Sequence, residues 1–153
     1  IKLKYDLVNQ SLVIQPQENS GNIGIELINQ KIDSFEIDKT LFVNLNKVTK
    51  LTDDRNFYIK KKLDKNLSLY YYHEKKTKEN IKNNQIKTKF EVYKEHFIVE
   101  KEGNYYEFIT KKDLILIYPR LENEIESYYK SYTLDKDSLE FRISILRYIS
   151  QIN

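Results

Sequence analysis

The residues that could act as acids, bases or metal ligands are few in this sequence and widely spaced. His73 and His96 are its only histidines, so neither has a second histidine at metal-ligand spacing. Cysteine is absent, which excludes a thiolate zinc site and a cysteine nucleophile within these residues. We therefore predict no metal site and interpret both histidines as surface or packing residues.

Nucleophilic, nucleotide and acid–base chemistry also lack their usual signatures. The sequence has only three glycines, all at predicted turns, and contains neither a Gly-x-Ser-x-Gly elbow nor a glycine-rich phosphate loop. Carboxylate pairs such as Asp53–Asp54 and Glu124–Glu126 are expected to face solvent rather than to share a proton. We predict no catalytic residues, no cofactor and no enzymatic activity.

Tyrosine is the residue type that most suggests a binding role. The run Tyr70–Tyr71–Tyr72 falls on a predicted strand, which must send neighbouring rings to opposite faces. Rings that point away from a core beside lysines can stack on a partner. The interpretation that we favour is that these rings are half-buried at the edge of the sheet. The predicted contact residues are Tyr71, Tyr72, Tyr105 and Tyr106.

The first two thirds of the chain has the period-two apolar pattern of strands. The clearest predicted hairpin joins residues 57–63 to 67–72 through Asp64-Lys65-Asn66, and a second has its turn at Glu102-Gly103-Asn104. Residues 74–87 are almost entirely polar, and we predict a solvated excursion between strands there. Strand patterns resume at residue 88.

The apolar period changes at Thr110, which with Asp113 resembles a helix N-cap and its acidic first turn. Pro119 ends that helix and suits the first turn of the next, and Asp135 or Asp137 is the expected cap of a third. We predict an α+β fold, namely an antiparallel β-sheet or partly closed barrel of roughly ten strands followed by two or three short C-terminal helices.

Length and composition fit one globular domain over residues 1–153, with a β-rich part at 1–109 and a helical part at 110–153 packed on it. Hydrophobic residues make up 40% and charged residues 32%, which fits neither a disordered chain nor a membrane span. The net charge is only +3, and the lysine runs at 60–62 and 75–78 are short and lie near carboxylates. A nucleic-acid-binding basic domain is therefore the alternative rather than the first prediction.

Several short packing and turn motifs resemble an uncharacterised group of β-rich proteins from Bacteroidota, and together they span almost the whole chain. These motifs are Lys4-Tyr5-Asp6-Leu7, Asp33-Ser34-Phe35, Phe42-Val43-Asn44-Leu45, Leu67-Ser68-Leu69-Tyr70, Lys111-Lys112-Asp113-Leu114 and Leu146-Arg147-Tyr148-Ile149. The resemblance implies an exported protein with a periplasmic, cell-surface or secreted location, and the start at Ile1 is compatible with removal of an export signal. It implies no activity and supplies no site residues.

These observations predict a non-enzymatic envelope or secreted protein that acts as a binding module or as an accessory subunit of a larger assembly. A protein partner is expected and a nucleic-acid partner is not. No stretch of the sequence is apolar and long enough for a transmembrane helix.

Overall fold

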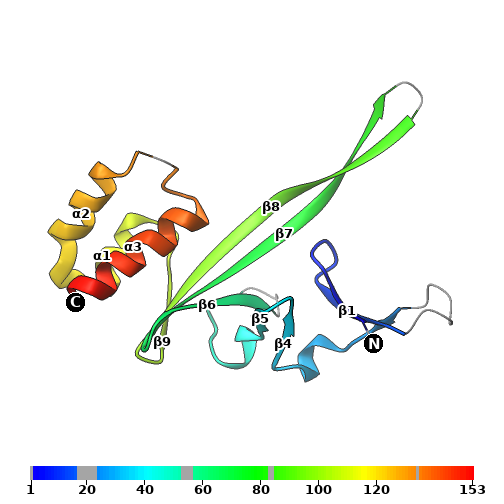
Figure 1. Cartoon of the computed structure of the whole chain (residues 1–153), viewed down its shortest axis with the longest axis horizontal. Helices are drawn as coiled ribbons and strands as arrows, with labels where there is room; N and C mark the ends of the chain where they lie inside the picture. The colour runs from blue at the N-terminus through cyan, green and yellow to red at the C-terminus, as the bar shows by residue number, and fades with distance from the viewer. Residues whose placement is uncertain (1, 17–23, 53–56, 83–84, 134) are drawn as a thin grey trace. The chain divides into compact units, whose positions relative to one another are not determined.

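The computed structural model of the chain describes residues 2–16, 24–52, 57–82, 85–133 and 135–153. The fold is α+β and antiparallel, as the sequence predicted, and its strands precede three helices (Figure 1). The strands are β1 (Lys2–Asp6), β2 (Ser11–Gln15), β3 (Ile25–Glu26), β4 (Ser34–Ile37), β5 (Thr40–Val43), β6 (Tyr58–Asp64), β7 (Leu67–Lys82), β8 (Gln85–Lys101) and β9 (Asn104–Glu107). The helices are α1 (Lys111–Ile117), α2 (Glu122–Ser131) and α3 (Leu139–Ile152), with 3-10 turns η1 (Asn29–Lys31), η2 (Leu45–Lys47) and η3 (Pro119–Leu121).

Strands that follow one another in the sequence are neighbours in two sheets. One sheet has the order β1-β2-β3, and the other has the order β4-β5-β6-β7-β8-β9. Across the described residues both orders are open, so the barrel alternative is not the one adopted. Because strands that are consecutive in the sequence are also neighbours in the sheet, turn residues in the sequence indicate where one strand ends and its partner begins.

Two of the turns have the backbone conformation that tight hairpins need. Asp38 and Lys39 join β4 to β5, and Glu102 and Gly103 join β8 to β9, all with positive φ. Two consecutive residues with positive φ match the right-handed twist of the flanking strands, as in a type I′ turn. The predicted turn at Glu102–Asn104 is confirmed.

The chain divides into two compact units, each built from two separate stretches. Unit 1 contains Ile1–Ile59 and Tyr71–His96, and unit 2 contains Lys60–Tyr70 and Phe97–Asn153. The divisions fall inside strands β6, β7 and β8. The helices therefore share a unit with segments of strand, and the single-domain prediction stays a prediction.

Unit 1 has an aromatic core that its sheet register brings together. Phe35 of β4 lies opposite Phe42 of β5, and their rings stack with centroids 4.7 Å apart. Tyr5 of β1 packs against both rings, and Phe57 meets Tyr5 and Phe35 edge-on. Leu45, at the start of η2, is also fully buried.

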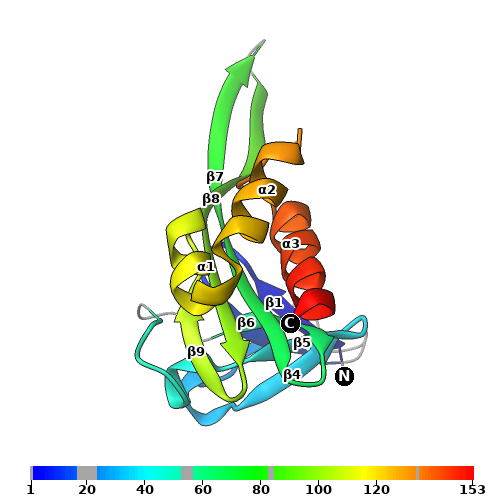
Figure 2. The same ribbon diagram turned by 90° about the vertical axis from the view of Figure 1, so that its left-hand side faces the viewer.

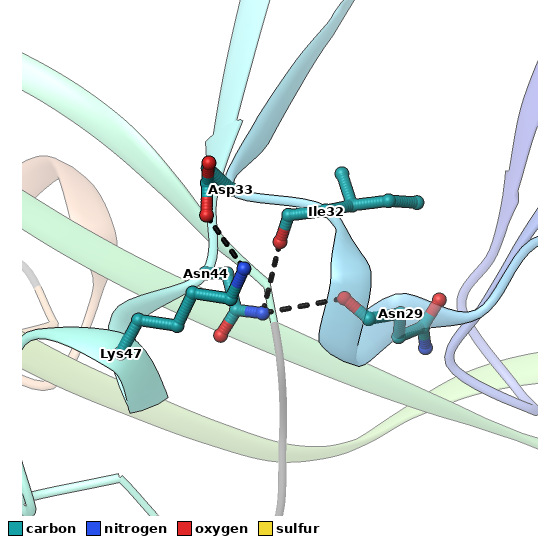
Figure 3. Close-up of polar contacts among 5 residues, drawn as sticks. All are labelled: Asn29, Ile32, Asp33, Asn44 and Lys47. Atoms are coloured by element: carbon teal, nitrogen blue, oxygen red, sulfur yellow. Dashed lines mark hydrogen bonds and ion pairs between the residues drawn. The ribbon is translucent and has the colours of Figure 1, made fainter.

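A buried amide organises the loops beside this core (Figure 3). The Asn44 side chain is almost fully buried, and its Nδ2 donates to the carbonyls of Asn29 and Ile32 at 3.3 and 3.0 Å. The Asn44 backbone N–H donates to the Asp33 carbonyl at 2.8 Å, while Lys47 pairs with the Asp33 carboxylate at 2.6 Å. Asn44 thus supplies hydrogen bonds to backbone groups that no regular strand satisfies.

The helices of unit 2 begin at specific side-chain caps. Thr110 and Asp113 form the predicted capping box of α1, in which Asp113 Oδ2 accepts from the Thr110 backbone N–H at 2.7 Å. Pro119 opens the turn that leads into α2. The cap of α3 is Ser138, whose Oγ accepts from the Phe141 N–H at 3.1 Å, so the prediction of an aspartate cap was wrong. Figure 2 shows α2 and α3 side by side.

Arg142 of α3 ties this helix to the strand segments of unit 2. The side chain is 5% exposed, and Nη1 and Nη2 donate to the carbonyls of Phe108 and Ile109 at 2.6 and 3.0 Å. Its guanidinium carbon lies 4.3 Å from the ring centroid of Phe97 and 4.8 Å from that of Phe108. The planar group therefore combines hydrogen bonding along its edge with stacking on its faces.

Candidate functional site

The Tyr70–Tyr72 run alternates between core and surface, as a strand requires. Tyr70 and Tyr72 are buried, whereas Tyr71 is half-buried and its ring lies 5.1 Å from that of His73. Tyr72 is 2% exposed and packs on Tyr58 at 5.7 Å, so a partner cannot reach it in this structure. Burial raises the pKa of Tyr71 above its ordinary value.

The other two predicted contact residues, Tyr105 and Tyr106, lie on β9 in unit 2, whereas Tyr71 and Tyr72 belong to unit 1. Tyr106 is 38% exposed. Tyr105 is partly covered, with its ring 6.0 Å from that of Tyr70, and burial followed by the nearby Glu100 carboxylate raises its pKa. The accessible predicted residues are therefore Tyr71, Tyr105 and Tyr106, and their binding role stays a prediction.

The histidines have structural contacts. His96 Nδ1 lies 2.9 Å from the Tyr58 hydroxyl, and His73 Nδ1 lies 2.8 Å from Glu95 Oε1 without the angles of a hydrogen bond. Within the described ranges, no three His, Cys, Asp or Glu side chains gather as a metal site would need. Asp53–Asp54 lies outside the described residues.

The largest departure from the sequence-based expectation is at residues 74–87. Of these residues, 74–82 and 85–87 belong to strands rather than to a loop, because β7 continues to Lys82 and β8 begins at Gln85. Figure 1 shows the two strands as a long ribbon. We call residues 74–82 of β7 and 85–95 of β8 the arm; all of them belong to unit 1.

The arm exposes large apolar side chains that a core would normally hold. Ile81 of β7 and Ile86, Phe90 and Val92 of β8 are between 55% and 78% exposed. Because side chains alternate along a strand, the three even-numbered residues of β8 share one face. Such a row of apolar residues on a surface is typical of an interaction site.

The arm also holds a net charge equal to that of the whole chain. It carries seven lysines and four glutamates, which gives +3, and the chain total is 26 positive minus 23 negative residues, also +3. On β8, Lys87, Lys89 and Glu91 are odd-numbered and lie on the face opposite to Phe90. The arm is therefore amphipathic, with an apolar face and a charged face on the same strand.

The edges of the arm are open over much of their length. β6 has 7 residues against the 16 of β7, and β9 has 4 against the 17 of β8, so both outer strands stop before the arm begins. On the β7 side, the Lys75 N–H donates to the Leu7 carbonyl at 3.0 Å. On the β8 side, the described pairing with β9 covers only Ile98–Lys101, outside the arm. Open edges expose backbone donors and acceptors that can pair with another chain.

Sequence reasoning missed the arm, although a signal was present. Ile86, Thr88, Phe90 and Val92 alternate with polar residues, and no glycine or proline occurs between Gly24 and Gly103. The low apolar content of residues 74–85 concealed this pattern, because an arm that is exposed on both faces does not need alternating hydrophobic residues along its whole length.

Unit 2 has two neighbouring cavities, of about 330 and 210 Å³, that share Lys101, Glu102, Tyr118 and Asn153. Lys101 Nζ donates to the Ile117 carbonyl at 3.3 Å and lies 4.4 Å from the Tyr118 ring centroid. Burial, followed by the charges near it, raises the pKa of Tyr118 to about 12. The lining mixes both charge signs with apolar surface and selects no class of ligand.

Comparison of the chain with protein-family models, with curated proteins and with solved structures found no match. Within the described residues, no helix combines the length and the apolar character needed to cross a membrane. The arm is thus the feature of this structure that most specifically suggests a function.

Proposed function

We propose that this chain is a non-enzymatic binding protein of the cell envelope or secreted fraction that acts as an accessory subunit of a larger protein assembly. The arm supplies the contact surface. The observation that carries the proposal is the exposure of Ile86, Phe90 and Val92 on one face of β8. The resemblance to exported Bacteroidota proteins supports the location.

The apolar face suits a protein partner. An aromatic ring flanked by aliphatic side chains can fill a complementary pocket, and burial of such anchors supplies most of the binding energy at protein interfaces. The lysines on the opposite face stay hydrated and keep the free arm soluble. Tyr71 and Tyr106 are additional proposed contacts.

Capture of partners from a native envelope extract tests the proposal. The tagged chain is used as bait at moderate salt, and recovered proteins are identified by mass spectrometry. We expect one membrane or secretion complex to be recovered reproducibly by the unchanged chain and lost when Ile86→Ser and Phe90→Ser are combined. Loss of an anchor of this kind costs about 2 kcal/mol or more, or roughly thirtyfold in affinity.

Leu116→Ser is the matched control, because Leu116 is also a large apolar residue, is 79% exposed and lies outside the arm. This variant should recover the same complex as the unchanged chain. Equal recovery by the arm variant, or recovery of the bait alone, would count against the proposal. Tyr71→Ala and Tyr106→Ala test the tyrosines in the same assay.

The charge of the arm favours one second candidate, a nucleic-acid-binding module. Lys76 and Lys78 on β7 and Lys87 and Lys89 on β8 are each two residues apart, so each pair shares a face of its strand. Contacts between lysines and phosphates weaken steeply as salt rises. A gel shift with DNA and RNA at low and moderate salt tests this candidate, and no shift at low salt excludes it.

A further inference from the structure

We infer that the open edge of β8 pairs with the same edge of a second copy of this chain, antiparallel and centred on Phe90. This inference goes beyond the proposed function, because it concerns the backbone edge of the arm rather than its apolar face. It rests on the direction of backbone groups and on the order of charges along β8.

The backbone groups that are available for pairing follow from the contact with β9. Val99 lies opposite Tyr106, and the Phe108 N–H donates to the Phe97 carbonyl at 3.0 Å. The backbone N–H and C=O of Phe97 therefore point toward β9, which is the side of β8 that is open along the arm. These groups alternate between the two edges along a strand. Lys89 and Glu91 therefore direct their N–H and C=O groups to the same open edge as Phe97.

Antiparallel pairing about Phe90 makes use of these outward groups. It sets Lys89 of one copy opposite Glu91 of the other as a hydrogen-bonded pair, and the two-fold symmetry repeats this contact. Phe90 then meets Phe90 of the second copy at a non-hydrogen-bonded position, where Cα atoms approach to about 4.5 Å and side chains are closest. Thr88 faces Val92 on the same side, so the apolar face becomes continuous across the junction.

The charge pattern fits a second copy. Over residues 86–94 this register sets no like charges directly opposite one another, and it forms the Lys89–Glu91 pair twice. The +3 charge of each arm opposes association at long range, but physiological salt screens charges beyond about 8 Å. An isolated two-stranded ribbon is marginally stable in water, and pairing would convert two such ribbons into one four-stranded sheet.

Sedimentation equilibrium of the full chain over a range of concentrations, combined with charge reversal, tests the inference. Lys89→Glu and Glu91→Lys each create two like-charge contacts, and we expect each to weaken the dimer about tenfold. An equimolar mixture of the two variants should restore association, because the acidic side chain introduced at position 89 then meets the basic one introduced at position 91. The double variant should dimerise like the unchanged chain.

Lys87→Glu is the matched control, since it makes the same charge change on the same face of β8 but faces no carboxylate in this register. It should not weaken the dimer. A monomer at all concentrations would overturn the inference, and so would a dimer that the single reversals leave unchanged. Partner capture by a monomeric chain would leave the proposed function standing while this inference failed.

Discussion

The Arg142 guanidinium lies in the core of unit 2, where its two hydrogen bonds satisfy the carbonyls of Phe108 and Ile109. A shorter lysine side chain has one point-like charge and cannot reproduce two parallel donors or the stacking on Phe97 and Phe108. The identity of this residue therefore matters beyond its charge.

We expect Arg142→Lys to lower the free energy of unfolding by about 1–3 kcal/mol, because at least one buried carbonyl loses its donor. Urea denaturation followed by circular dichroism measures this change. Arg147→Lys is the control, since Arg147 lies on the same helix but is exposed, and it should shift stability by less than about 0.5 kcal/mol. Equal midpoints for the two variants would contradict the prediction.

The roles of single residues were only partly predictable from the sequence. Strand alternation correctly separated Tyr71 from its neighbours, since that rule is local. It did not show that the pair Tyr70 and Tyr72 would be the buried one, because burial depends on which other elements cover each face of a strand. Arg142 gave no signal, since its partners lie more than thirty residues away.

At the scale of elements, helix starts depend on a few adjacent side chains. The Thr110–Asp113 pair was predictable because a capping box is defined within four residues. For α3, the sequence predicted Asp135 or Asp137 as the cap, but Ser138 is the cap because it directly precedes the residues with helical backbone. Asp135 instead accepts from the Asp137 N–H at 2.9 Å in the preceding turn.

Replacement of the cap distinguishes these residues. Ser138→Ala removes the acceptor of the Phe141 N–H, and we expect it to destabilise the protein by about 1 kcal/mol. Asp137→Ala should have less than half this effect, since Asp137 is not the N-cap. Thermal or urea unfolding of both variants measures the difference, and a larger loss for Asp137→Ala would refute the assignment.

The arm shows where pattern reasoning fails for elements. Strands are recognised because one face is apolar, but residues 74–82 carry one large apolar side chain, Ile81, and residues 76–81 are exposed on both faces. Their strand conformation follows from hairpin continuity with β8. A tertiary contact, from Lys75 to Leu7, also lies outside what local patterns describe.

At the scale of the whole molecule, one buried and one half-buried tyrosine link stability to alkaline pH. Burial is the main cause that raises the pKa values of Tyr118 and Tyr129 to about 12, from 10.0 in an unstructured chain. Well below pH 10 both phenols are neutral in either state, so their contribution to folding stability is complete. Between pH 10 and pH 12 the unfolded chain ionises first, and stability falls as pH rises.

We therefore expect the urea midpoint to decrease from pH 10 to pH 12, together with the appearance of tyrosinate absorbance on unfolding. Replacing Tyr118 and Tyr129 with phenylalanine should make this decrease shallower, because two of the phenols that titrate differently in the two states are gone. A decrease of the same steepness in the double variant would show that other groups cause it.

The interleaving of the two units has a consequence for how this chain can be recombined. Unit 1 is interrupted by residues 60–70 and unit 2 lacks residues 71–96, so neither corresponds to one continuous stretch of gene. A single crossover within the chain always leaves at least one unit divided between the two parents. Exchange of one unit between homologous genes would need several simultaneous crossovers, so the two units should be inherited together.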